Sequence, residues 1–274
     1  MINIIKKDEP INTYHASEPI SRSKLMWLDK TPQYFKWRLT AEEKETDALQ
    51  LGKAFHKLAL EEKDFDLEFA VEPKVNKRTN EGKEILANFY FENAGKTIIS
   101  PNIYLLAQDM VTALRANARA RQLIESGEIE KSYYWTDSLT EEQVKCRPDI
   151  VITKKTKGAV IDLKSCLHAD NETFRRDALT HGYDVQAYMC KSALEKITGI
   201  PHDFYFLCVE KEPPYLINVF KADELFLEHG KRRYREFLGL YHDCKITDNW
   251  FGYEGFADEI NELNLPAYLL KEFQ

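Results

Sequence analysis

Two acidic residues and a lysine lie close together in the middle of the sequence, within RPDIVITKKTKGAVIDLKS (147–165). Asp149 follows Pro148, and Asp162 and Lys164 come thirteen and fifteen positions after Asp149. Two carboxylates held together repel each other unless a cation lies between them, and hard oxygen ligands of this kind suit Mg²⁺ or Mn²⁺. A lysine beside them can orient or help to deprotonate a water and offset the charge of a phosphate. The pattern therefore favours a divalent metal site.

Three short stretches rich in β-branched or aromatic residues surround these side chains. They cover residues 128–137, 142–155 and 157–165. Turn-prone residues separate them, which predicts an antiparallel meander. Pro148 cannot donate to a strand ladder, so it marks an edge or a bulge that re-aims the next side chain. The two-residue period of a strand places Asp162 and Lys164 on one face. The alternative is that Asp149 and Asp162 are edge residues and that Lys164 pairs with one of them.

Helical patterns fill the first third of the chain and return after the meander. Ser21 stands where it could cap a helix, and Leu51, Phe55 and Leu58 recur at helical spacing. The expected helices cover residues 21–30, 40–62, 81–93, 103–125, 171–198 and 222–243. Two further strands are expected at residues 202–210 and 214–221. This order predicts an α/β fold with a mixed central sheet, whose antiparallel meander is flanked by helices.

The length and composition of the chain suit one large domain. Its 274 residues are 43% hydrophobic, which is enough for a substantial core. We expect a single domain over residues 1–274, with a helical part of about 14–125, a sheet core of about 128–221, and a C-terminal helix and tail of about 222–274. No apolar run reaches the ~18–20 residues that span a bilayer, and the N-terminus lacks the pattern of a signal peptide. A cytoplasmic location without membrane contact is expected.

Charge and cysteine content exclude some classes of function. With 38 basic and 45 acidic residues, the net charge of −7 is not that of a protein that coats nucleic acid. A local basic channel can still coexist with an acidic exterior. Basic clusters occur at residues 73–83, 154–157, 174–176 and 230–235. Five widely spaced cysteines without a C-x-x-C pair argue against a disulfide framework, a structural zinc and an iron–sulfur cluster.

The stretch from Arg147 to Ser165 resembles the signature of PD-(D/E)xK nucleases. More narrowly, the chain resembles the RecE-type exonucleases (exodeoxyribonuclease VIII-like) of phages and prophages in six blocks along nearly its whole length. These blocks are YHASEPISRSKL (14–25), LGKAFHKLALEE (51–62), RTNEGKE (78–84), EKSYYWTD with KCRPDI (130–150), GYDVQAYM (182–189) and DNWFGY (248–253). The D-x-K alone is a common tripeptide, whereas six blocks in order are specific.

The resemblance implies a role for each residue of the catalytic cluster. His56 would be a metal ligand together with Asp149, Asp162 and the backbone carbonyl of Leu163. Lys164 would activate the attacking water. Gln186 would help to orient catalytic groups or DNA, and the alternative is that Gln186 is only a polar residue of a buried helix.

Several residues are candidates for DNA contact. Arg78, Arg147, Arg175 and Arg176 are candidates because a guanidinium group binds phosphate bidentately. On the resemblance alone, Lys24 with Ser21 and Ser23 would receive a 5′-phosphate, although Ser21 suits a helix cap equally well. Related nucleases often place a tyrosine four residues after the glutamine. Here Cys190 holds that position, so Tyr188 is the candidate substitute.

The function that the resemblance implies is metal-dependent 5′→3′ digestion of linear double-stranded DNA, leaving a 3′ single-stranded tail for strand annealing. Mg²⁺, or Mn²⁺ in its place, would bind as two ions per site. Family members form closed homo-oligomeric rings around DNA, and their usual partner is a RecT-type single-strand annealing recombinase. One alternative is a single-strand or flap nuclease of the RecB type, whose relatives often carry a four-cysteine cluster that this sequence lacks. The other alternative is a catalytically inactive DNA-binding module.

Overall fold

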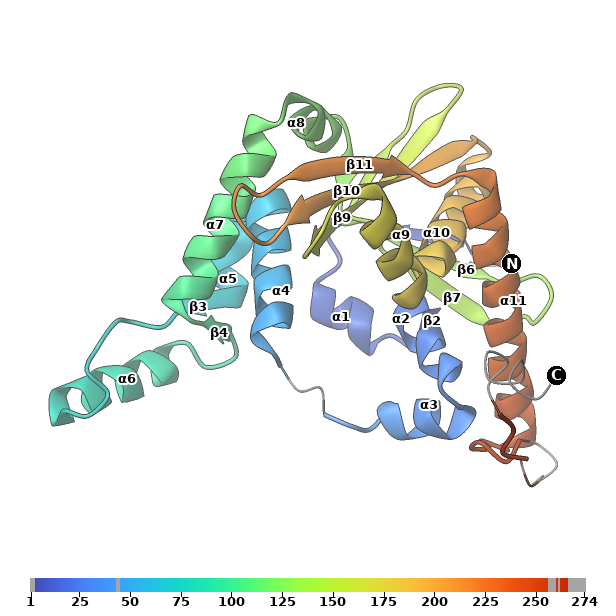
Figure 1. Cartoon of the computed structure of the whole chain (residues 1–274), viewed down its shortest axis with the longest axis horizontal. Coiled ribbons are helices and arrows are strands. Elements are labelled where there is room, and N and C mark those ends of the chain that lie inside the picture. The colour runs from blue at the N-terminus through green and yellow to red at the C-terminus, as the bar shows by residue number, and fades with distance from the viewer. Residues whose placement is uncertain (1–2, 43–44, 256–259, 261, 266–274) are drawn as a thin grey trace.

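The computed structural model describes residues 3–42, 45–255, 260 and 262–265. Its centre is a five-stranded sheet with the strand order β11-β10-β9-β8-β5 (Figure 1). These strands are β5 (Glu128–Ile129), β8 (Ile150–Ile152), β9 (Gly158–Cys166), β10 (His202–Glu210) and β11 (Ile217–Lys221). Strands β9 and β10 pair in parallel, and the other neighbours pair antiparallel. The expected α/β class with a mixed central sheet is confirmed.

A second sheet has the order β1-β6-β7-β2. Its strands are β1 (Asn3–Lys6), β2 (Ile20–Ser21), β6 (Ser132–Thr136) and β7 (Gln143–Cys146). The expected meander is therefore wrong in one respect: its first two strands are each divided between the two sheets. The division of the second strand falls at Pro148, which cannot donate to a ladder. The division of the first falls at Glu130, whose φ of 54° departs from strand geometry.

The helices follow the predicted pattern, with several breaks. They are α1 (Ile11–Ala16), α2 (Arg22–Leu25), α3 (Pro32–Arg38), α4 (Asp47–Leu60), α5 (Phe65–Glu68), α6 (Asn80–Glu92), α7 (Pro101–Ala116), α8 (Ala118–Glu125), α9 (Asn171–Thr180), α10 (Tyr183–Thr198) and α11 (Glu224–Thr247). Two 3₁₀ turns cover Met26–Asp29 and Glu62–Asp64, and two short parallel strands are β3 (Phe69–Val71) and β4 (Thr97–Ile99).

Three differences from the predicted helices have a local cause. The helix expected over 103–125 ends before Asn117, whose side chain caps α8. The helix expected over 171–198 breaks at Gly182, which has a φ of 65°. Helix α4 begins after Thr46, whose side chain accepts from the N–H of Leu49. The prediction of a helix from residue 40 includes residues 43–44, which lie outside the described residues, as does most of the predicted tail beyond residue 255.

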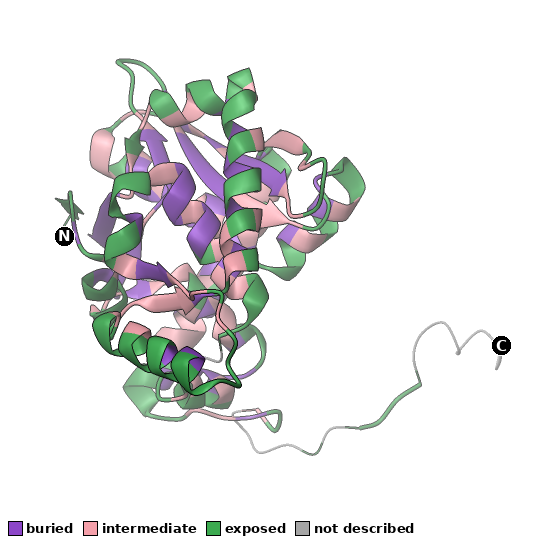
Figure 2. Ribbon diagram, turned by 90° about the vertical axis from the view of Figure 1, so that its left-hand side faces the viewer, coloured by how far each residue is buried: buried purple, intermediate pink, exposed green. Residues whose placement is uncertain are grey.

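Apolar side chains from the central sheet build a core on each of its faces. Val160, Phe204 and Phe206 pack against α10 and α11, whereas Ile161 and Leu207 pack against α4 and α7. Figure 2 shows the buried residues on the strands and on the inward faces of the helices. Because side chains alternate along β9, Asp162 points to the same face as Val160. Within the described residues, no helix is both long and apolar enough to cross a membrane.

Two glycines on α11 offer a test of how this helix packs on α10. A Cβ added at Gly230 would lie 2.0 Å from the carbonyl oxygen of Asp184, whereas one added at Gly239 would meet nothing within 4 Å. We expect Gly230→Ala to lower the free energy of unfolding by about 2–3 kcal/mol, because the two helix backbones must separate. Gly239→Ala should raise it by about 0.5–1 kcal/mol, because alanine is the better helix former. Urea unfolding of the two variants measures both effects, and equal shifts in one direction would contradict the packing.

Candidate active site

Pairing of β8 with β9 brings the two aspartates together. The register places Ile150 opposite Ile161, so Asp149, which precedes β8, lies next to the middle of β9. The backbone N–H of Leu163 donates to Oδ2 of Asp149 at 2.6 Å. The side chains of Asp149 and Asp162 are only 12% and 3% exposed. Burial of both carboxylates makes their charge costly unless it is compensated.

Asp162, Lys164 and Gln186 form one cluster of polar contacts. Nζ of Lys164 lies 2.5 Å from Oδ2 of Asp162. Nε2 of Gln186 donates to Oδ1 of Asp162 at 2.5 Å, and Nζ of Lys164 donates to Oε1 of Gln186 at 3.3 Å. Oδ2 of Asp162 is buried and accepts no hydrogen bond of good geometry from a described residue, so its contact with Lys164 is an ion pair. The structure therefore places these three residues in mutual contact.

His56 approaches the aspartates from α4. Its Nδ1 atom lies 3.8 Å from Oδ2 of Asp149. The pKa of His56 is lowered by burial and by the nearby charge of Lys164, while Asp162 and the backbone of Leu163 act in the opposite direction. The imidazole is therefore held in its neutral form, which is the form that binds metal ions. Gly52, one turn earlier on α4, lies where a Cβ would be 3.6 Å from Oγ of Ser165, so the helix passes close to β9.

The cluster holds two carboxyl groups and one lysine, and their mutual effects on pKa favour the binding of a further cation. Burial, and next the charge of Asp162, raise the pKa of Asp149 to about 8. The pKa of Lys164 is also raised, because Asp162 and Tyr183 outweigh the opposite effect of burial. One lysine thus faces two buried carboxyl groups, and a further cation would relieve their repulsion.

The donor atoms at this site are of the types that a hard divalent ion binds. In the structure, however, they are not arranged around one common position. Two carboxylates, a neutral imidazole and the carbonyl of Leu163 are ligands that Mg²⁺ and Mn²⁺ accept. Among the described residues, however, no three or more histidine, cysteine, aspartate and glutamate side chains are grouped closely enough to hold a metal ion. Lys164 and Gln186 occupy the oxygens of Asp162. The ammonium group of Lys164 stands in for a cation there.

Glu130 is a member of this site that the sequence did not reveal. Its N–H donates to the carbonyl oxygen of Asp149 at 3.0 Å, and its side chain accepts from Nε of Arg147 at 2.5 Å. Burial, and next Asp149, raise the pKa of Glu130 to about 7, although Arg147 acts against them. Only the pairing of two divided strands places Glu130 beside the Arg-Pro-Asp turn. The block EKSYYWTD, which begins at Glu130, was the only signal for this position in the sequence.

Arg147 is largely buried and already has partners. Besides its bond to Glu130, its Nη1 atom donates to the carbonyl oxygen of Glu9 at 2.6 Å and to Oγ of Ser132 at 3.4 Å. Its side chain is 8% exposed. The guanidinium therefore ties the Arg-Pro-Asp turn to the second sheet, and a phosphate would have to compete with these partners.

Arg22 is a second residue that the sequence reasoning missed. It begins α2, and its Nη2 atom donates to Oε1 of Gln186 at 2.6 Å while Nη1 donates to the carbonyl oxygen of His181 at 3.2 Å. The block YHASEPISRSKL, which contains it, was the available signal. Ser21 occupies the N-cap position of α2 without a side-chain capping bond, and Lys24 is half-buried on the same short helix.

The other candidates for DNA contact lie apart from the carboxylates. Tyr188 packs against Tyr234 of α11, with ring centroids 5.5 Å apart, and its part as the substitute tyrosine stays a prediction. Arg175 and Arg176 are exposed on α9, and Arg176 pairs with Glu172 of the same helix at 3.6 Å. Arg78 is exposed just before α6, the helix that projects from the body in Figure 1.

A cleft of about 820 Å³ opens beside the cluster, between α1, α4 and β5. His56, Glu130 and Arg147 form part of its wall, and His15 and Lys53 lie on the same wall. The cleft carries both basic and acidic side chains, and His56 in its wall lies 3.8 Å from Asp149. It is large enough for a nucleotide-sized substrate.

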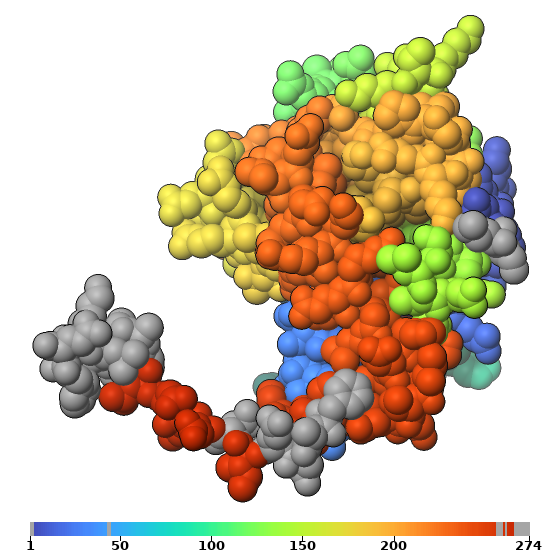
Figure 3. Space-filling model, turned by 90° about the vertical axis from the view of Figure 1, so that its right-hand side faces the viewer, coloured from blue at the N-terminus to red at the C-terminus, as the bar shows by residue number. Residues whose placement is uncertain are grey.

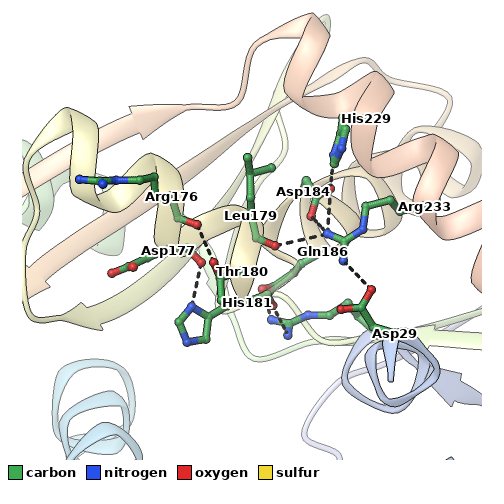
Figure 4. A network of polar contacts seen from close by, with 11 residues as sticks. Asp29, Arg176, Asp177, Leu179, Thr180, His181, Asp184, Gln186, His229 and Arg233 are labelled. Carbon is green, nitrogen blue, oxygen red and sulfur yellow. Dashed lines mark hydrogen bonds and ion pairs between the residues drawn. The ribbon is translucent and has the colours of Figure 1, made fainter. Parts of the chain in front are cut away.

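A buried network fixes the helix that carries Gln186 (Figure 4). Asp184, two residues earlier on α10, is completely buried. It accepts from Nη1 of Arg233 at 3.0 and 3.3 Å, and Nδ1 of His229 lies 2.7 Å from its Oδ2. Nη2 of Arg233 also pairs with Asp29 at 3.3 Å. The first turn of α10 is thus anchored to α11, and Gln186 is held in place by the same turn.

Comparisons with known proteins identify the family and the fold of the chain. The profile of the PDDEXK-like domain of unknown function (DUF3799) matches residues 21–262. A solved structure titled "Putative exonuclease" from Eubacterium rectale is 14% identical, with a TM-score of 0.64 over 97% of this chain and 98% of the other. An alkaline exonuclease from Laribacter hongkongensis is 15% identical over 72% of this chain and 95% of the other, with a TM-score of 0.28. No curated protein sequence matches significantly.

The likeness to the Eubacterium rectale structure shows a shared fold. The family match covers most of the sequence, and it includes both aspartates, the lysine, His56 and Gln186. The chain therefore belongs to the PDDEXK-like DUF3799 family and has the fold of a PD-(D/E)xK nuclease.

Proposed function

We propose that the protein is a metal-dependent exodeoxyribonuclease that degrades linear double-stranded DNA in the 5′→3′ direction and leaves 3′ single-stranded tails. The observation that carries the proposal is the cluster of two buried carboxylates, one lysine and one glutamine beside a neutral imidazole. These groups lie on a nuclease fold and next to an open cleft. RecE-type activity is the member of this class that the sequence blocks favour.

Asp149, Asp162, His56 and the carbonyl of Leu163 would hold Mg²⁺, with Mn²⁺ as a substitute and two ions per site. When bound, such ions polarise a phosphate and make a bound water more acidic. Lys164 has a raised pKa, so it stays protonated and acts as a donor to water or phosphate rather than as a base. Gln186 bonds to both Asp162 and Lys164, and it keeps the two side chains aligned.

The proposed enzyme would act as an assembly of several copies with a protein partner. A homo-oligomeric ring around DNA would reconcile the net charge of −7 with DNA binding, because only the inner surface must be basic. A RecT-type annealing recombinase would take up the 3′ tail. No base specificity is expected, since contacts to phosphate carry no sequence information.

A cleavage assay tests the reaction and its substrate. In Mg²⁺, the wild type should consume linear duplex DNA and spare closed circles, single strands and flaps. Asp162→Asn and Lys164→Met should each lower the rate by at least about 100-fold, because they remove a metal ligand and a charged donor. Asp243→Asn, an exposed aspartate on α11, is the control and should cut normally. Preference for flaps, or normal cutting by Asp162→Asn, would refute the proposal.

Thermal unfolding tests the metal site without measuring cleavage. The pKa of Asp149 is about 8 when folded and about 4 when unfolded. Ionisation of Asp149 therefore lowers the stability of the folded state. This loss is absent below pH ~4, grows as the pH rises, and is complete above pH ~8. In EDTA, we expect the Tm of the wild type to fall more than that of Asp149→Asn between pH 5 and 8.5. Mg²⁺ at pH 8.5 should raise the Tm of the wild type and leave the variant unchanged.

Two results of the Tm comparison would contradict this prediction. Equal pH dependence of the wild type and Asp149→Asn in EDTA would show that the buried carboxyl carries no such cost. An equal rise of both Tm values with Mg²⁺ would place the ion elsewhere.

A further inference from the structure

A second cleft, of about 480 Å³, lies between α8 and the sheet strands β8, β10 and β11. Its floor includes Ile152, Tyr205 and Val219, which are half-buried, and its rim includes Arg119, Lys154 and Lys221, which are exposed. Figure 3 shows this end of the molecule at the top, where α8 lies beside the projecting turn between β8 and β9.

This cleft is separate from the candidate active site. Tyr205 pairs with Ile161 across β10 and β9, and both lie on the face that packs against α7. Asp162 and Lys164 alternate with Ile161 along β9, so their side chains leave the sheet on the opposite face. None of the residues that line the second cleft also lines the cleft beside His56.

The rim of the second cleft is cationic. No residue lining it is acidic. Arg119 and Lys154 make no ion pair with any residue in the described part of the chain. Lys221 pairs with Asp203 at 3.0 Å, but Lys157 pairs with the same carboxylate at 2.8 Å. That corner therefore keeps an excess of one positive charge, although the chain as a whole carries a charge of −7.

The floor of the second cleft, below its basic rim, is a flat and weakly polar surface. The hydroxyl of Tyr205 donates to Asp203 at 3.2 Å, which restrains the phenol ring on a floor that it shares with Ile152 and Val219. A ligand that satisfies both parts must carry negative charges and an aromatic or apolar group. Single-stranded nucleic acid has this composition, since its phosphates bind basic side chains while its bases stack on aromatic ones.

We propose that this cleft binds single-stranded DNA, with phosphates against Arg119 and Lys154 and a base against Tyr205. The choice of DNA rests on the proposed function, because resection of a duplex leaves one strand unpaired. The cleft would hold that surviving strand beside α8, away from the cleft that His56 lines. The binding itself needs neither metal nor cleavage.

Fluorescence anisotropy in EDTA with a labelled 15-nucleotide oligo-dT tests the proposal. Arg119→Glu with Lys154→Glu should weaken binding by at least about 10-fold. It should also reduce the slope of log K against log salt by about 1.4, which corresponds to two phosphate contacts. The control is Lys231→Glu with Arg232→Glu, which makes the same change of charge on exposed residues of α11 and should bind nearly as the wild type does. Equal weakening by both double variants would overturn the proposal.

Two further measurements separate a DNA site from a site for any anion. Tyr205→Ala should weaken oligo-dT binding by about 5-fold or more through lost stacking, while Tyr205→Phe should not. Tripolyphosphate at equal phosphate concentration should displace oligo-dT poorly, and equal displacement would reject single-stranded DNA as the ligand. If the charge-reversal variant has a lower Tm than the wild type, the double variant Arg119→Ala with Lys154→Ala replaces it. We expect this variant to lose affinity for oligo-dT as well, by a smaller factor.

The outcome is independent of the cleavage test. Refutation of the proposed function, for example by normal cutting by Asp162→Asn, would leave these binding results intact. Conversely, unchanged oligo-dT binding by the Arg119 and Lys154 variants would reject the second site and leave the proposed reaction untouched.

Discussion

The burial of two carboxylates beside a single lysine is the constraint on which the rest of the site depends. Asp149 and Asp162 cannot both keep a negative charge in this environment without a compensating cation, a proton or strong donors. The N–H of Leu163, the ammonium of Lys164 and the amide of Gln186 supply the donors. Each comes from β9 or from α10. A stable fold thus carries a locally unfavourable arrangement, as sites that bind ions commonly do.

The exchange of strands between two sheets creates the position of Asp149. At Pro148 the chain leaves one sheet and joins the other, and on the neighbouring strand Glu130 departs from strand geometry at the same level. The bond between Glu130 and Arg147 closes this crossing. Asp149 is therefore displayed by a rigid turn rather than by a regular strand, and the same crossing opens the cleft beside His56.

The sequence predicted the parts of the fold that have a regular period or a marked boundary. Alternation along residues 157–165 placed Asp162 and Lys164 on one face, and proline marked the point where the strand divides. The short strand β1 was missed because all of its residues are exposed, so it has no alternation to detect. Glu130 and Arg22 were missed because their contacts join segments 17 and 164 residues apart. The contact of Tyr188 with Tyr234 of α11 could not be inferred from spacing, because it depends on how two helices pack.

The anchoring of α10 by α11 also orders events during synthesis. Gln186 is held by the turn that contains Asp184, and the partners of Asp184 are His229 and Arg233, which leave the ribosome well after the strands and the lysine have been made. A nascent chain that has exposed both aspartates therefore still lacks the support of its glutamine. The proposed DNA cleavage would therefore become possible only after the last long helix has emerged and fixed the position of Gln186.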